Sequence, residues 1–303
     1  TTSMKTKNRY YNYDKDLRKK LMKVSFGHSD FCKCLSSMLF ADIPKCFIEG
    51  YRPTVQSGNI SYPRSPNLIF SANSWWYDEV FKFWAATHAE KGTPLLGTPH
   101  GGDYAARFIQ PSRKHEAEIV DYYYPWGLRG KKLKSKLIPM PAVKLMALKN
   151  IGSNNDKNGI LWVTTSWSRY VASEFPYCAP EHYNNYLSWQ KRFAEALSFK
   201  TSSAVCLRAH PADFGWDVVS RLKNCIPGLK LDSPKMPLSE SMSNCRLYVC
   251  DHLSTTYAEA LSSNMPTILF WSSEANPLTS HAEQYFELLR SVGVLYDSPE
   301  AAA

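Results

Sequence analysis

A turn rich in hydroxyl groups follows a short apolar run in the last fifth of the chain. The run Leu247–Cys250 has the composition of a buried strand, and Ser254, Thr255 and Thr256 follow it closely. Ser254 or Thr255 is a typical N-cap, so a helix is expected to begin here. The free N–H groups and the dipole of a helix N-terminus favour an anion, and the three hydroxyls can add hydrogen-bond donors.

The same stretch continues as one β-α-β step. Asn264-Met265-Pro266 is expected to end the helix, and a second apolar strand begins at Thr267. Glu259, one turn into the helix, is placed where a carboxylate can reach a ribose hydroxyl. A capped helix in a parallel sheet, with no ligand at all, explains this stretch equally well.

Three further polar residues are expected at strand ends in the same half of the chain. Arg169 follows the predicted strand Ile160–Thr164, and Arg208 and His210 end the predicted strand that begins at Ala204. Because open α/β sheets bind ligands at the carboxyl ends of their strands, these residues and the hydroxyl turn predict a phosphate site. A structural capping histidine is the commoner explanation for His210 taken singly.

The first half of the chain offers carboxylates and histidines at predicted strand ends. Glycosyl transfer needs a carboxylate or histidine as general base, or a carboxylate as nucleophile. The candidates are Glu49, His100, Asp103, His115, Glu116 and Asp121. Each of them singly also fits a surface charge or an ion-pair partner. Gly101 and Gly102, directly after His100, indicate a sharp bend or a close approach of the backbone to a ligand.

Alternating strands and helices in both halves predict an α/β protein with two Rossmann-like domains facing a cleft. We expect the segment Ile43–Tyr51 to be a strand that ends at Glu49-Gly50. The polar, glycine-bearing segment Gly152–Gly159 resembles a linker. The predicted domains are therefore 1–155, for acceptor and catalysis, and 156–303, for nucleotide binding.

The composition bounds the class of partner. The 303 residues carry 36 Lys and Arg against 27 Asp and Glu, a net charge of +9 that suits an anionic ligand or surface. Eight cysteines without paired CxxC spacing indicate reduced thiols of a cytoplasmic protein rather than a zinc site. No apolar run is long enough to span a bilayer. The chain begins at Thr1 without a methionine, so we expect it to be a trimmed piece of a longer protein.

Several motifs together resemble a known group of enzymes. They are His100-Gly101-Gly102-Asp103-Tyr104, His115-Glu116 with Asp121, Trp126-Gly127, and Asp251 with Ser254-Thr255-Thr256 and Glu259. The combination resembles transferases of bacterial surface-polysaccharide gene clusters, a family similar to the β-Kdo transferases that use CMP-Kdo (CMP-3-deoxy-manno-octulosonic acid). The pairs Glu49-Gly50, His210-Pro211 and Ser254-Thr255 are also similar to motifs of bacterial sialyltransferases.

The resemblance implies a GT-B, metal-independent glycosyltransferase that moves Kdo or a related 2-keto sugar acid from CMP to a lipopolysaccharide, O-antigen or capsule glycan. No cofactor is expected, and the acceptor would be a glycan or glycolipid. His210, Arg208 and the Ser254–Thr256 turn would bind CMP, and Arg169 would pair with the sugar carboxylate. Glu49, Glu116 or Asp121 would act as base or nucleophile, oriented by His100 or His115. The protein would be cytoplasmic, with a peripheral contact to the inner membrane.

Two other classes of protein remain open on the sequence. One is a UDP-sugar transferase or an epimerase of GT-B shape. The other is a basic, tyrosine-rich nucleic-acid-binding protein. The second is disfavoured because the basic residues do not fall on one helix or strand set and the aromatic residues have core-like spacing, so we expect no nucleic-acid partner.

Overall fold

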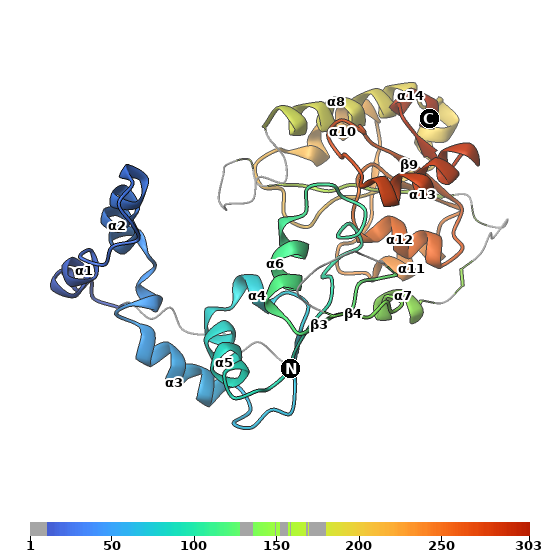
Figure 1. The fold of residues 1–303 in the computed structure, drawn as a ribbon. Coiled ribbons are helices and arrows are strands. Elements are labelled where there is room, and N and C mark those ends of the chain that lie inside the picture. The colour runs from blue at the N-terminus through green and yellow to red at the C-terminus, as the bar shows by residue number, and fades with distance from the viewer. Residues whose placement is uncertain are drawn as a thin grey trace. The chain divides into compact units, whose positions relative to one another are not determined.

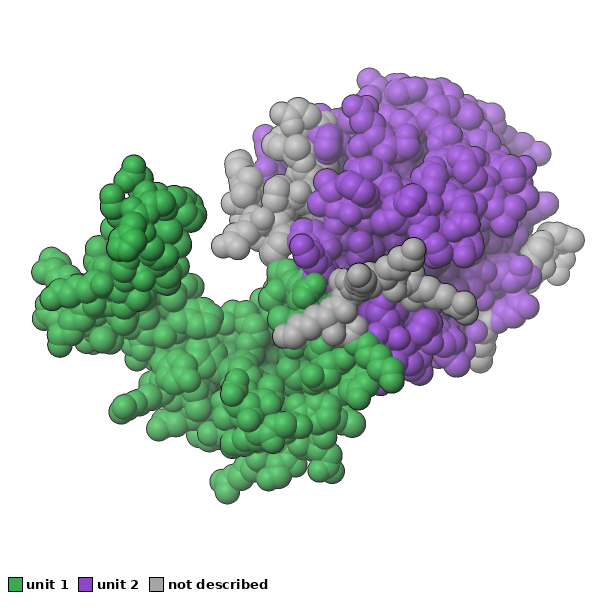
Figure 2. Space-filling model, viewed as in Figure 1, with its two compact units in different colours: residues 1–98, 115–123, 132–136 green, residues 99–114, 124–131, 137–303 purple. Residues whose placement is uncertain are grey.

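The computed structural model describes residues 11–127, 136–148, 150–151, 157, 159–167, 169 and 180–303. The chain forms two compact units (Figure 2): unit 1 holds residues 1–98, 115–123 and 132–136, and unit 2 holds residues 99–114, 124–131 and 137–303. This division differs from a single boundary at 155/156, because the loop after residue 98 packs with the C-terminal half. Residues 152–156 of the predicted linker lie outside the described residues.

Unit 1 is built on short parallel strands with helices beside them (Figure 1). The sheet order is β1-β2-β3-β4, and β2 pairs in parallel with both β1 and β3. The elements are α1 (Lys15–Leu21), α2 (Asp30–Asp42), η1 (Lys45–Phe47), α3 (Tyr51–Ser61), β1 (Ile69–Ser71), α4 (Ser74–Tyr77), α5 (Glu79–Ala89), β2 (Leu95–Gly97) and β3 (Tyr122–Tyr123). The residues of α6 (Pro111–Ile119) and β4 (Lys136–Leu137) are divided between the two units.

The strand predicted over Ile43–Tyr51 is wrong. The segment forms the 3₁₀ helix η1, and helix α3 begins at Tyr51. Its backbone hydrogen bonds are local: the N–H groups of Ile48 and Gly50 both donate to Lys45 O, at 3.2 and 2.8 Å. Since these groups are satisfied within a turn, they are not available to a neighbouring strand.

Unit 2 contains a six-stranded sheet in the order β10-β9-β8-β5-β6-β7, with all neighbouring strands parallel. The elements are α7 (Val143–Met146), β5 (Ile160–Val163), α8 (Pro180–Ala196), α9 (Phe199–Ser203), β6 (Val205–Arg208), α10 (Val218–Cys225), β7 (Lys230–Leu231), α11 (Leu238–Ser243), β8 (Leu247–Cys250), α12 (Thr255–Ser262), β9 (Thr267–Phe270), α13 (Ser280–Ser291), β10 (Leu295–Tyr296) and α14 (Pro299–Ala302). In chain order the strands run 3-2-1-4-5-6 across this sheet, which is the Rossmann order.

The strands of unit 2 alternate their side chains between two hydrophobic cores. Trp162 of β5 and Val249 of β8 face the core under α8 and α10, whereas Leu161 and Tyr248 face the core under α12 and α13. All four side chains are at most 1% exposed. A sheet covered on both faces needs strands that are apolar throughout, which explains the continuous apolar runs.

None of the helices in the described part of the chain is long and apolar enough to cross a membrane. The seven cysteines within the described ranges are free thiols, and Cys178 lies outside them.

Candidate functional site

The candidate site lies at the point of the unit 2 sheet where the strand order reverses. Strand β5 is flanked by β8 on one side and β6 on the other. Val163 pairs with Cys250, so the loops that begin at Thr164 and Asp251 leave the sheet side by side. In open α/β sheets, ligands bind at this reversal, outside the carboxyl ends of the strands.

Asp251 is the first residue after β8, and four side-chain donors surround its carboxylate. Tyr186 donates to Oδ1 at 2.8 Å, and His252 Nδ1 lies 3.0 Å from the same oxygen. Trp162 and Gln190 donate to Oδ2 at 3.1 and 2.9 Å. The aspartate is 2% exposed. A buried carboxylate is stable only when its oxygens are satisfied in this way. The four donors therefore fix the position of the Asp251 carboxylate at the carboxyl edge of the sheet.

His252 is the ion-pair partner of the Asp251 carboxylate. Burial alone would lower the pKa of the imidazole, but the Cys250 sulfur and the Asp251 carboxylate raise it to about 10. His252 is therefore an imidazolium at neutral pH, held by its Nδ1 at the edge of the sheet.

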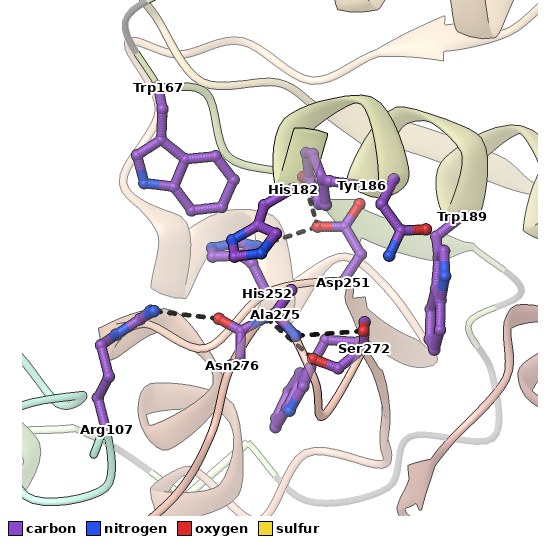
Figure 3. Close-up of a pocket in the computed structure, with 12 residues that line it drawn as sticks. Arg107, Trp167, His182, Tyr186, Trp189, Asp251, His252, Ser272, Ala275 and Asn276 are labelled. Carbon is purple, nitrogen blue, oxygen red and sulfur yellow. Dashed lines mark hydrogen bonds and ion pairs between the residues drawn. The ribbon is translucent and has the colours of Figure 1, made fainter. Parts of the chain in front are cut away.

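A pocket with aromatic walls lies directly beside this pair (Figure 3). Trp167 and Trp189 lie on either side of the Asp251 carboxylate in this view, and the ring of Trp167 is 5.4 Å from that of Tyr186. The pocket is lined by Arg107, Trp167, His182, Asn185, Tyr186, Trp189, Asp251, His252, Trp271, Ser272, Ala275 and Asn276. Flat rings around a charged pair suit a ligand that has a planar ring and an anionic group.

Arg107 lines one end of the pocket, and its guanidinium is hydrogen-bonded to other residues of the protein. Its guanidinium donates to Asp103 Oδ2 at 3.1 Å, to Asn276 Oδ1 at 3.2 Å and to the carbonyl of Leu253 at 3.1 Å. It thereby ties residues 103–107 to the loops after β8 and β9. Asp103, a candidate carboxylate in the sequence, serves this ion pair.

The paired glycines approach the backbone of α12 closely. Gly102 N donates to Thr255 Oγ1 at 3.0 Å. A Cβ at Gly102 would lie 3.2 Å from Thr255 Cα and 3.3 Å from Ser254 O, and a Cβ at Gly101 would lie 3.0 Å from Thr255 Oγ1. The close approach at these glycines is to the N-terminus of helix α12, and the approach to a ligand stays a prediction. A side chain at either glycine would require its neighbours to shift.

The predicted Ser254–Thr256 turn forms at this edge. Ser254 is the N-cap of α12, and its Oγ accepts from Thr256 N at 3.4 Å and lies 3.2 Å from Thr256 Oγ1. Strands β8 and β9 begin and end where the apolar runs predict. The turn, the Asp251–His252 pair and the glycine loop are therefore brought together.

Arg208 stays at the carboxyl edge of the sheet, but groups that follow the parallel strand β7 engage its guanidinium. Its guanidinium pairs with Asp232, donates to Ser241 Oγ at 3.1 Å and donates to the carbonyls of Ser233 and Met236 at 3.3 and 2.8 Å. These partners belong to α11 or to the connection between β7 and α11. The structure thus makes Arg208 an internal clamp, in place of the phosphate ligand that its position at a strand end predicted.

Arg169 and His210 meet the same loop, residues 210–216. Arg169 donates to Gly215 O at 3.1 Å and lies 5.6 Å from the ring of Trp216. His210 is exposed, its Nδ1 accepts from Ala212 N at 3.1 Å, and its ring is 5.6 Å from that of Phe214. The two residues share this loop, and neither lines the pocket beside Asp251.

Glu259 is buried and forms an ion pair with Lys144 of α7. It lies one turn into α12, as predicted, but its carboxylate is engaged in tying α7 to that helix. It does not line the pocket beside Asp251.

Glu49 forms a buried ion pair inside unit 1. Arg18 donates to both carboxylate oxygens, at 2.7 and 2.8 Å, and Asp14 N donates at 3.0 Å. The hydrogen bonds from Arg18 lower the pKa of Glu49 to about 2, against the opposing effect of burial. A carboxylate with such a low pKa is a weak base, so the arrangement suits a structural pair better than a catalytic base.

The other predicted catalytic residues of unit 1 differ in their burial and in their hydrogen-bond partners. Glu116 is 0% exposed and accepts from Trp76 Nε1 at 2.9 Å and from the Tyr123 hydroxyl at 3.1 Å. Asp121 accepts from Leu95 N at 2.8 Å and so joins β2 to the start of β3. His115 is exposed, and its ring lies 4.6 Å from that of Trp76.

His100 and His115 both have exposed side chains. Burial and the charge of Lys82 lower the pKa of His115, so its imidazole is neutral at neutral pH and can accept a proton. His100 is exposed and belongs to unit 2, one residue before the glycine pair that binds α12.

Sequence reasoning missed the Asp251–His252 pair and the aromatic pocket as a site. An Asp-His dipeptide directly after a buried strand was the available signal, since two polar residues at that position must be satisfied by partners. The partners come from α8, about sixty positions earlier, and no local pattern announces them. In the described ranges of the chain, no group of three or more His, Cys, Asp or Glu could hold a metal ion.

The fold is the GT-B-like α/β fold that the sequence predicted. Among solved structures, a protein assigned as a UDP-N-acetylglucosamine 2-epimerase from Listeria monocytogenes matches with a TM-score of 0.50 at 11% identity, over 84% of this chain and 68% of that one. MnaA of S. aureus with UDP matches at 0.48 and 10% identity, over 94% and 81%. MurG of Acinetobacter baumannii matches at 0.44 and 9% identity, over 84% and 66%.

The chain belongs to the LIC12162 family of transferases, whose sequence model matches residues 2–303. No curated protein matches the sequence significantly.

Proposed function

We propose that this transferase is a glycosyltransferase that moves Kdo or a related 2-keto sugar acid from a CMP-activated donor to a lipopolysaccharide or capsule glycan. The observation that carries the proposal is the buried Asp251–His252 pair, with His252 Nδ1 3.0 Å from Asp251 Oδ1, beside the N-terminus of α12 at the strand-order reversal. The family and the GT-B-like fold support a transferase acting on a nucleotide sugar. The motif resemblance supports the CMP-linked sugar acid.

The donor would bind along this edge. The phosphate would lie between His252 and the Ser254–Thr256 turn. The pyrimidine would lie toward Trp167 and Trp189, whose pocket of about 30 Å³ must widen to admit it. Transfer breaks the bond between the anomeric carbon and the phosphate oxygen, so the leaving CMP gains one negative charge. The imidazolium and the helix N-terminus stabilise that charge, and for this reason we propose that no metal is needed.

The acceptor hydroxyl must lose a proton as the new glycosidic bond forms. We assign this step to His100, because it is exposed and lies on the loop that Gly102 fixes to α12. His115 is the second candidate, since its imidazole is neutral at neutral pH. Glu49 and Glu116 are left as structural residues, because donors engage their carboxylates.

A UDP-sugar enzyme of the same fold is the second candidate function, and the fold shared with the Listeria protein favours it. Charge does not separate the two donors: CMP-Kdo carries one phosphate and one carboxylate, and a UDP-sugar carries two phosphates, so each has two negative charges. The pyrimidine and the number of phosphates do differ, so a comparison of CMP with UDP separates them.

Isothermal titration calorimetry with CMP and UDP tests the donor assignment. We expect CMP to bind at least tenfold more tightly than UDP, and the His252→Gln variant to bind CMP at least tenfold more weakly. Lys200→Ala is the control, because Lys200 is an exposed cation on α9, which precedes β6, and it does not line the pocket. Tighter binding of UDP selects the second function, and unchanged CMP affinity in His252→Gln contradicts the proposed site.

We also propose that the protein lies on the cytoplasmic face of the inner membrane, where a glycolipid acceptor is found. Helix α2 has no buried residue, although most of its side chains are apolar, and Phe31 and Met38 are 74% and 56% exposed. Lys19 and Lys20 lie on the adjacent helix α1. Exposed apolar side chains next to lysines suit an anionic bilayer surface.

Co-sedimentation with vesicles tests this surface. Wild-type protein is expected to bind phosphatidylglycerol-containing vesicles at low salt, and the double variant Lys19→Glu/Lys20→Glu is expected to lose most of the binding. Lys200→Glu on α9 of unit 2 is the matched control. Equal binding by the double variant and the wild type would refute the contribution of α1.

A further inference from the structure

Unit 2 contains a second cavity, of about 410 Å³, which shares no lining residue with the Asp251 pocket. It is bounded by Gly101 and Gly102, by Trp126, and by helices α12 and α13. Its volume is within the range of small-molecule sites, about 300–1,000 Å³. None of the features proposed above uses this space.

The walls combine small residues with aromatic rings. Ala105, Ala258 and the two glycines leave the hollow, while Tyr104, Trp126, Tyr257, Tyr285 and Phe286 present flat apolar faces to it. Tyr285 is 57% exposed, and its ring is packed edge-on against His281 at 5.5 Å. Accessible aromatic faces with polar tips can stack on the apolar face of a sugar ring while offering hydroxyls to its edges.

The cavity is uncharged, in a chain of net charge +9. Among the described residues that line it, none is Lys, Arg, Asp or Glu, and His281 is the one histidine. This lining differs from that of the Asp251 pocket, where the imidazolium of His252 favours an anion. A neutral ligand therefore fits here better than a phosphate or a sugar acid.

The loop that carries the proposed base forms part of the cavity wall. Pro99, Gly101 and Gly102 line it, and His100 stands between them in the chain. Because Gly102 N is hydrogen-bonded to Thr255 Oγ1, this loop has a fixed position against α12. A molecule in the cavity would thus lie against the loop that carries the proposed base.

We propose that this cavity binds a neutral sugar unit of the acceptor glycan. The assignment rests on the proposed glycosyltransferase function, and it gives acceptor recognition to Trp126 and Tyr285. Specificity would come from stacking and from hydroxyl hydrogen bonds, so the subsite would select neutral hexoses or N-acetylhexosamines over acidic sugars.

Saturation-transfer NMR on the full chain without nucleotide tests the subsite. The probes are a panel of neutral di- to tetrasaccharides of hexose and N-acetylhexosamine, an acidic sialyl-trisaccharide, and a sugar-free alkyl tetraethylene glycol ether. We expect at least one neutral saccharide to bind, and we expect the Tyr285→Ala and Trp126→Ala variants to weaken it at least fivefold. Leu288→Ala, on the same helix α13 and 61% exposed, is outside the cavity and should bind as the wild type does.

The outcomes are distinct. Binding of no saccharide, binding of the alkyl ether alone, preference for the acidic trisaccharide, or unchanged affinity in both aromatic variants would each overturn the subsite. Because no nucleotide is present, these results do not depend on the donor. Calorimetry of Tyr285→Ala with CMP should give the wild-type affinity, and a failure of CMP to bind the wild type would count against the donor proposal instead.

Discussion

Replacing Asp251 with asparagine tests the buried charge pair. The side chain keeps its size, but it loses its charge, and one acceptor oxygen becomes an NH₂ group. The carboxylate oxygens now accept from Tyr186, Gln190 and Trp162 and contact His252 Nδ1. At least one of these donors must therefore face another donor in Asp251→Asn.

The expected loss of stability is large. A hydrogen bond to a charged group contributes about 1.5–3 kcal/mol, and breaking a buried pair by removing one partner costs about 3–5 kcal/mol. We expect the free energy of unfolding of Asp251→Asn to fall by about 3–5 kcal/mol. A domain of this size has a total of about 5–15 kcal/mol.

The pH dependence adds a second signature. The folded-state pKa of His252 is raised from 6.5 to about 10, so its contribution to stability is complete below pH 6.5 and is lost as pH rises through the folded value. Wild-type stability should therefore decline over this window. In Asp251→Asn the decline should be smaller, because burial then lowers the pKa of the imidazole without the opposing carboxylate.

Urea unfolding at several pH values and an NMR titration of the His252 ring measure both effects. Glu300→Gln, which breaks an exposed pair with Arg192, is the control and should leave the free energy of unfolding close to the wild-type value, because solvent screens such a pair. The reasoning is refuted if the wild-type imidazole titrates at or below its ordinary pKa of 6.5. That titration needs only the wild-type protein, so it remains decisive even if the variant fails to fold.

Three further changes have defined outcomes. Glu49→Gln should lower the free energy of unfolding by about 1.5–3 kcal/mol at pH 7. Because Arg18 lowers the folded pKa of Glu49 to about 2, the wild type should lose this stability as pH falls from 4.5 towards 2. If the acid unfolding curve of the variant follows that of the wild type, the pairing is contradicted. Gly102→Ala should lower stability by about 1–3 kcal/mol and weaken nucleotide binding, since its Cβ would lie 3.2 Å from Thr255 Cα; calorimetry and melting curves that match the wild type would show that the loop yields. Arg208→Ala should cost about 2–4 kcal/mol in urea unfolding but leave CMP affinity within twofold; a stable variant with lost affinity would restore the phosphate role.

The β8-α12-β9 step could be predicted from the sequence because its signals are local. The apolar run Leu247–Cys250 is buried on both faces, as a central parallel strand must be, and Ser254 caps the following helix. The segment Ile43–Tyr51 was misassigned because an apolar run after a proline also fits a turn of 3₁₀ helix. Only the neighbouring chain decides between these two outcomes.

The partners of individual side chains could not be predicted in this way. Arg208 and Glu259 stand where the sequence places them, but Asp232 and Lys144 engage their charges from other elements. A position at a strand end determines where the Cα of a residue lies. It does not determine which group forms the hydrogen bond or ion pair with its side chain. The Asp251–His252 pair was missed for the same reason, since its donors lie on α8 and β5.

Release of CMP from CMP-Kdo tests the central claim most directly. Wild-type protein with CMP-Kdo should release CMP, slowly by hydrolysis and faster with a glycan acceptor, and His252→Gln should lower both rates at least tenfold at equal folded concentration. Release of CMP at the wild-type rate by His252→Gln would contradict the proposed site. No release of CMP, with release of UDP from a UDP-sugar under the same conditions, would contradict the CMP-linked donor.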